Sequence, residues 1–200
     1  MNSHLFKILF DKLTGINLAA MENMNKTTIA GIDHIGINVP DIDAATLFLQ
    51  DAFGAEVMYE SYSKEKPPLV VEDADATTLN MAQRSELHSC RMIKIGKGIN
   101  IELFEIHVNG QRESVRSSDI GLQHFAVYTD DISESLQRFT SAGGKVLSEP
   151  KPLLFPLETG EKNFFCYGTT PWGSTVEFIT YPKGMPYEDQ TSFRRWKAGQ

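Results

Sequence analysis

"GIDHIGINVP", residues 31–40, has a close counterpart in "GLQHFAVYTD", residues 121–130. Each stretch reads Gly, apolar, polar, His and then alternating apolar residues, and each leads into an Asp-Ile pair. The two histidines, His34 and His124, are 124 − 34 = 90 positions apart. Such a repeat indicates two copies of one structural module.

Both copies continue alike along the chain. Apolar residues recur at helical spacing over residues 42–53 behind Asp41, and again over residues 132–139 behind Asp131. Aspartate is a favourable N-cap, so we expect a helix after each first strand. Three β-rich stretches come next in each copy: "AEVMYESY", "SCRMIKIG" and "INIELFEI", then "KVLSE", "NFFCYG" and "STVEFITYP". The pattern predicts an α+β fold of paired βαβββ modules.

The spacing of the repeat also predicts how the chain is divided. The final strands of the copies carry Glu102 and Glu177, which are 177 − 102 = 75 positions apart, 15 fewer than the histidines. The first copy therefore carries an insertion. We predict an N-terminal amphipathic extension (1–27), a first module (28–115) with an insertion at about 62–85, a second module (116–182) and a C-terminal tail (183–200).

Composition narrows the classes of partner. The 200 residues have a net charge of −7 and no basic stripe with interleaved aromatics, which argues against nucleic-acid binding. Charged residues interrupt the apolar run of residues 1–27, so we expect neither a membrane span nor a signal peptide there. Two cysteines without CxxC spacing favour a reducing compartment, and we expect a cytoplasmic protein.

Four side chains in repeat register are candidate metal ligands. Strand side chains alternate, so His34 and Glu102 point away from the apolar, helix-facing positions of their strands, as do His124 and Glu177. Two imidazoles and two carboxylates suit one divalent ion, with Zn, Ni, Co, Mn, Mg and Fe all open. Glu105 competes as a ligand, but its parity places it on the other face. His4, His88 and His107 have no counterparts and are interpreted as structural or surface residues.

The motifs "HIGINVPDIDAA", "IELFE", "HFAVYTDDI" and "PWGSTVEF" resemble the vicinal oxygen chelate superfamily over about residues 28–182. This superfamily includes glyoxalase I, methylmalonyl-CoA epimerase, bleomycin-resistance proteins and extradiol dioxygenases. The resemblance implies a curved mixed sheet around a metal site, with metal positions on His34, Glu102, His124 and Glu177. It also implies a small-molecule substrate and a homodimer.

Residues outside the metal set distinguish the branches of this family. Dioxygenases use an acid/base histidine late in the chain, and no histidine comes after His124. Many glutathione-dependent glyoxalases carry an arginine where this chain has Asn38. The epimerase branch resembles this chain at Glu86, sixteen residues before Glu102.

We therefore expect a metal-dependent isomerase, epimerase or lyase that forms an enolate or enediolate next to a carbonyl, with Glu177 and Glu86 as catalytic carboxylates. An extradiol-type dioxygenase and a drug- or metabolite-sequestering protein are the alternatives.

Overall fold

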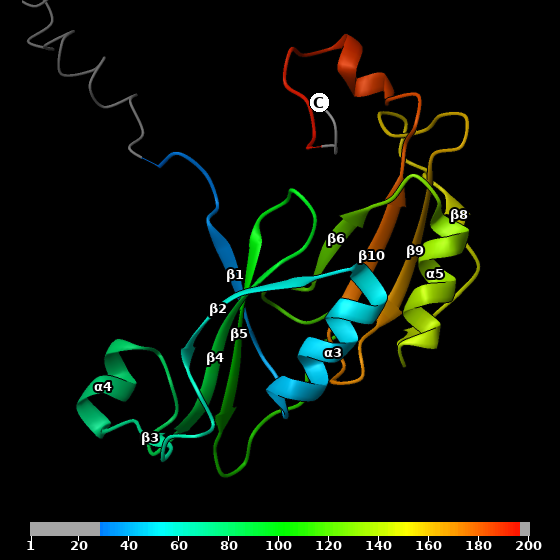
Figure 1. The fold of residues 1–200 in the computed structure, drawn as a ribbon. Coiled ribbons are helices and arrows are strands. Elements are labelled where there is room, and N and C mark those ends of the chain that lie inside the picture. Colours follow the sequence, from blue (N-terminus) through cyan, green and yellow to red (C-terminus); the bar gives the residue numbers. More distant parts are fainter. Residues whose placement is uncertain (1–28, 197–200) are drawn as a thin grey trace, which may run out of the picture. The chain divides into compact units, whose positions relative to one another are not determined.

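The computed structural model describes residues 29–196 (Figure 1). Residues from His34 onward form one compact unit, and residues 29–33, which precede it, have no regular secondary structure. The predicted N-terminal amphipathic extension, residues 1–27, lies outside the described residues. Within residues 29–196, no helix combines the length and apolar composition that a membrane crossing needs.

The first module is a mixed five-stranded sheet crossed by one main helix. Its strands run in the order β1-β5-β4-β2, with β3 paired to β4 and only β1–β5 parallel. Helix α3 joins β1 to β2, and the short helix α4 lies in the predicted insertion. The bounds are β1 (His34–Asn38), α3 (Ile42–Phe53), β2 (Glu56–Tyr62), β3 (Leu69–Val70), α4 (Asp73–Thr78), β4 (Glu86–Lys94) and β5 (Asn100–His107).

The second module repeats this topology. Its strands run in the order β6-β10-β9-β7, with β8 paired to β9 and β6 parallel to β10. The bounds are β6 (His124–Tyr128), α5 (Ile132–Ser141), β7 (Lys145–Val146), β8 (Lys151–Pro152), β9 (Phe164–Thr169), β10 (Thr175–Thr180) and the 3-10 helix η1 (Pro186–Asp189). The predicted α+β fold of paired modules is confirmed.

Both main helices begin at the predicted aspartates. Oδ1 of Asp41 accepts the backbone N–H groups of Asp43 and Ala44 at 2.9 and 3.0 Å, and Oδ1 of Asp131 accepts that of Glu134 at 2.9 Å. These bonds satisfy donors that the first helical turn leaves unpaired. Each capping aspartate comes three residues after the end of the strand that carries a candidate histidine.

One hydrophobic core joins the two modules. Phe48 of α3 packs edge-to-face on Phe139 of α5, with ring centroids 5.5 Å apart. Phe139 is fully buried, which contributes about 1.5–3 kcal/mol of stability. A Cβ on Gly144 would lie 2.4 Å from this ring, so the close approach requires glycine there. The other buried members are Val39, Ile42, Ala45, Leu49, Ala52, Ala55, Ile93, Ile101, Leu103, Val176 and Phe178.

Candidate metal centre

The first module brings His34 and Glu102 together. Strand β1 runs parallel to β5 with Gly36 opposite Glu102, so the two side chains share one face of the sheet. Nε2 of His34 lies 3.2 Å from Oε2 of Glu102, and both side chains are partly exposed. Their neighbours Ile101 and Leu103 point the other way, into the core. This is the arrangement that strand alternation predicts.

The second module contains an equivalent pair. Nε2 of His124 lies 3.1 Å from Oε2 of Glu177, whose side chain is 13% exposed. Burial raises the pKa of the Glu177 carboxyl above its ordinary value, against the opposing effect of the His124 imidazole. Nδ1 of His124 is also buried, and it has no hydrogen-bond partner among the described residues. The nitrogen beside the carboxylate is Nε2, and an imidazole nitrogen next to a carboxylate oxygen fits a pair of metal ligands.

Two further side chains border these pairs, and sequence analysis did not select them. Tyr167 on β9 is the cross-strand partner of Glu177, and its ring lies 5.4 Å from that of His124. Burial and the Glu177 carboxylate both raise the pKa of Tyr167. Cys90 on β4 is buried, with Sγ 3.7 Å from Oε1 of Glu102. Both contacts depend on strand register, which the sequence does not show.

The two pairs do not form a single cluster within the described chain. Within residues 29–196, no three of these four side chains bring ligand atoms within 4.8 Å of one another. Each module therefore contributes a His–Glu half-site. A four-ligand centre stays a prediction that requires the half-sites to meet.

The structure places Glu86 away from the first half-site. In the antiparallel β4–β5 pair, Glu86 is opposite His107, so these side chains share a face. His107 has the parity of Glu105, which accepts a hydrogen bond from the start of α3, and Glu102 has the opposite parity. The predicted catalytic position of Glu86 beside the metal does not agree with this register. The spacing of sixteen residues between Glu86 and Glu102 does not reveal the β-bulge between Leu87 and Ser89, which moves Glu86 to the other face of the sheet.

Asn38 has a structural role in this chain. Its carboxamide donates to the carbonyl of Ile106 at 3.0 Å and accepts the Ile106 N–H at 2.8 Å. These two bonds extend the pairing of β1 with β5. A side chain held in this way is committed to the backbone, which accounts for an asparagine at this position.

The C-terminal tail packs on its own chain. Nη1 of Arg195 lies 3.2 Å from Oε1 of Glu158, and its guanidinium stands over the Tyr181 ring at 5.5 Å. The Tyr181 hydroxyl donates to the carbonyl of Trp196 at 2.8 Å. Tyr181 also belongs to a small buried cluster with Leu153, Ile179 and Met185. The tail is thus anchored to the second module.

Comparison with known proteins agrees with the observed fold. Residues 33–156 match the family model of the glyoxalase/bleomycin resistance protein/dioxygenase superfamily. The chain belongs to this superfamily. A 2-epi-5-epi-valiolone epimerase from Actinomyces sp. is 29% identical to it over 168 residues, 83% of this chain and 87% of that protein.

Solved structures of other proteins share the fold. A glyoxalase family protein from Bacillus cereus has a TM-score of 0.58 and 17% identity, covering 78% of this chain and 97% of that one. A variant of the Listeria monocytogenes fosfomycin resistance protein, solved with Mn(II) and a dihydroxypropylphosphonic acid, has a TM-score of 0.51 and 16% identity, covering 82% of this chain and 100% of that one. At these identities the likeness concerns the fold.

Proposed function

We propose that this protein is a metal-dependent epimerase or isomerase acting at a carbon next to a carbonyl, with a lyase step as the related alternative. The observation that carries the proposal is the His–Glu pair at equivalent strand positions of each module, with separations of 3.2 and 3.1 Å. The epimerase from Actinomyces sp. supports the reaction class. Its substrate name denotes a ketone, which agrees with chemistry next to a carbonyl.

His34, Glu102, His124 and Glu177 would together hold one divalent ion. Two imidazole and two carboxylate donors suit Zn, Ni, Co, Mn or Fe, and Mg accepts the carboxylates. A bound ion would act as a Lewis acid toward a substrate oxygen. The Mn(II) complex of the fosfomycin resistance protein supports a metal-binding role for this fold.

Glu177 is the proposed proton acceptor. Before an ion binds, burial raises the pKa of the Glu177 carboxyl, and a general base works best when its pKa approaches the working pH. Tyr167, its cross-strand neighbour, has a raised pKa and therefore keeps its proton at neutral pH. An acceptor carboxylate and a donor phenol side by side suit removal and return of a proton.

We also propose that a homodimer completes the centre, the first half-site of one copy meeting the second half-site of the other. The separation of the half-sites within one chain motivates this step. The edge strand β2 adds exposed apolar surface at Val57, Met58 and Tyr59.

Mixing two variants tests the shared centre. His34→Ala and His124→Ala proteins should each lose metal and activity, whereas a refolded mixture should recover one intact centre per heterodimer. Recovery is expected because one of the two shared centres then contains both native histidines. Absence of recovery in a mixture shown to contain heterodimers would place the whole centre within one chain.

The reaction is tested with 2-epi-5-epi-valiolone in deuterated water. We expect metal-dependent deuterium incorporation next to the carbonyl and formation of an epimer, both monitored by NMR. Glu177→Gln should abolish exchange, while the matched control Glu86→Gln should retain it. A metal-loaded protein that exchanges no proton but consumes oxygen with a catechol would instead be a dioxygenase.

A further inference from the structure

We propose a second cation site, formed by His88, Glu105 and His107, on the face of the first sheet opposite to His34 and Glu102. One ligand atom from each of the three residues lies within 4.8 Å of the other two. No repeat partner exists for this group in the second module. The site is therefore separate from the two half-sites and does not depend on them.

Local strand geometry gathers the three side chains. Glu105 and His107 are two residues apart on β5 and so point to the same face. On β4, Leu87 pairs with Ile106 and Ser89 pairs with Glu105, which leaves His88 as the extra residue of a β-bulge. A bulge reorients the side chain that it inserts. Here it directs His88 to His107, with ring centroids 4.4 Å apart.

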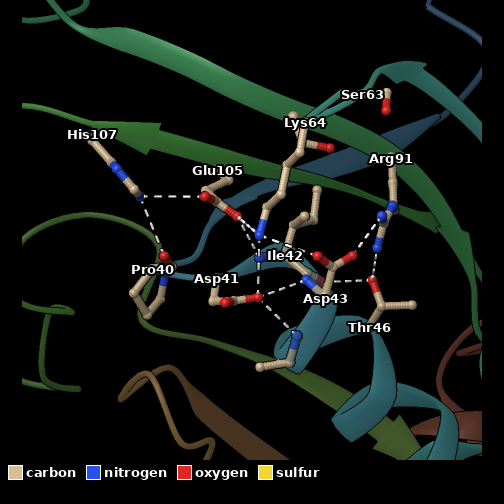
Figure 2. Close-up of polar contacts among 12 residues, drawn as sticks. Pro40, Asp41, Ile42, Asp43, Thr46, Ser63, Lys64, Arg91, Glu105 and His107 are labelled. Atoms are coloured by element: carbon tan, nitrogen blue, oxygen red, sulfur yellow. Dashed lines mark hydrogen bonds and ion pairs between the residues drawn. The ribbon is translucent and has the colours of Figure 1, made fainter. Parts of the chain in front are cut away.

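The Glu105 carboxylate is held in position from one side. Its side chain is 6% exposed, and Oε2 accepts the Ile42 N–H at 2.8 Å and lies 2.8 Å from Nζ of Lys64. Figure 2 shows Lys64 and His107 approaching this carboxylate. Oε1 therefore remains directed to the histidines, because the contacts with α3 and Lys64 occupy Oε2.

The spacing of Oε1 suits coordination better than a direct hydrogen bond. Oε1 of Glu105 lies 3.6 Å from Nε2 of His107, which is too long for an N–H···O bond. Ligand atoms bound at about 2.0–2.1 Å around a tetrahedral ion are roughly 3.4 Å apart. Small side-chain rotations would thus allow both atoms to bind one ion.

His88 supplies an incompletely satisfied nitrogen. Its Nε2 is buried and makes no hydrogen bond within residues 29–196, although Oε2 of Glu86 lies 3.5 Å away. Glu86 therefore lies beside the nitrogen that would bind the ion, and its carboxylate adds negative charge at the edge of the site.

Two imidazoles and one carboxylate select a divalent transition metal of the Zn²⁺, Co²⁺ or Ni²⁺ type. The Lys64 ammonium offsets part of the Glu105 charge, which disfavours hard cations such as Ca²⁺ that need several carboxylates. An ion here would connect the start of β4 with the end of β5, and binding through Nε2 of His107 would replace that atom's present 3.2 Å contact with the Pro40 carbonyl. Its role would be to stabilise this end of the module.

Zn²⁺ binding to the full chain tests this site. In a His34→Ala/His124→Ala protein, where the half-sites are disabled, we expect one Zn²⁺ per chain by metal analysis. The imidazole ¹⁵N signals of His88 and His107 should shift on titration, and the melting temperature should rise. Adding His107→Gln, which keeps a polar side chain near Pro40, should weaken Zn²⁺ binding by more than about 100-fold. His4→Ala, a histidine of neither set, is the matched control.

Two outcomes would overturn the proposal. One is a folded His34→Ala/His124→Ala protein that binds no Zn²⁺, and the other is Zn²⁺ binding that His107→Gln and His88→Ala leave unchanged. Proton exchange by the wild-type protein does not enter this test, so failure of the second site is distinguishable from failure of the proposed function. If no Zn²⁺ binds, the contact between His107 and the Pro40 carbonyl accounts for the arrangement of the three side chains without a metal.

Discussion

Replacing Lys64 by methionine should destabilise the protein, because this lysine neutralises a buried carboxylate. Its Nζ lies 2.8 Å from Oε2 of Glu105 and 3.2 Å from Oδ2 of Asp43 (Figure 2). Partial burial lowers the pKa of Lys64, but the ion pairs with Glu105 and Asp43 outweigh this effect and raise it above its ordinary value. Lys64 is therefore charged at neutral pH. Methionine keeps the apolar stem and removes the charge.

The size of the loss in stability depends on how deeply each partner of this ion pair is buried. Removing one partner of a fully buried pair costs about 3–5 kcal/mol, and removing a surface pair costs about 0–1 kcal/mol. Glu105 is 6% exposed, but Lys64 is 33% exposed and the Ile42 N–H still binds the carboxylate. We expect a loss of about 2 kcal/mol, or about 4–8 °C in melting temperature for a chain of this size.

Urea unfolding monitored by circular dichroism, in chelator-treated buffer, measures this loss. Lys66→Met is the matched control, since Lys66 makes a cation–π contact with Tyr62 at 5.5 Å, and its effect should stay within about 0.5 kcal/mol. A double-mutant cycle with Glu105→Gln should give a coupling energy of about 1–3 kcal/mol. A Lys64→Met protein as stable as Lys66→Met, or a coupling near zero, would refute the reasoning.

Three further predictions concern the half-sites, the core and the helix start. His124→Ala should lower metal occupancy markedly, as measured by elemental analysis; unchanged occupancy in both His124→Ala and His34→Ala proteins would contradict the ligand assignment. Gly144→Ala should lower the free energy of unfolding in urea by about 1–3 kcal/mol, because the new Cβ would lie 2.4 Å from the Phe139 ring. Gly98→Ala is the control and should cost less than about 1 kcal/mol, because the nearest atom to its Cβ would be 3.8 Å away. The Arg91 guanidinium lies 2.7 Å from Asp43 and lowers the pKa of the Asp43 carboxyl below its usual 3.8. The ion pair therefore stabilises the protein fully above pH 3.8, and this stabilisation is lost as the pH falls through the lowered pKa. The destabilisation by Asp43→Asn should accordingly shrink as the pH falls below about 4, and a pH-independent difference in urea midpoint would contradict this.

The repeat was sufficient to predict the fold and the face of each strand on which the candidate ligands lie. Alternation along "HIGIN" and "IELFE" placed His34 and Glu102 on one face, and the structure brings them within 3.2 Å. Helical periodicity identified the buried face of α3, and the preference for aspartate at helix starts identified both N-caps. These features are predictable because they depend on local geometry: a strand period of two, a helical period of 3.6 and unpaired N–H groups at a helix start.

Contacts between strands were beyond this local analysis. The pairing of Tyr167 with Glu177 and the approach of Cys90 to Glu102 each depend on antiparallel register. Glu86 shows the same limit, because a bulge changes the relation between residue spacing and sheet face. The sequence did contain one signal for the second cation site: Glu105 and His107 are two residues apart on a strand, which places them on the same face of the sheet.

By itself, the sequence determined that two βαβββ modules form, which side chains each strand directs away from the core, and where the main helices begin. Tertiary structure alone decided which of these side chains meet. It gathered His88, Glu105 and His107, and it kept the His34 and His124 half-sites from forming one cluster within the described chain. The physical reason is that side-chain direction is a property of the local backbone, whereas proximity depends on strand register, bulges and the packing of one module on another.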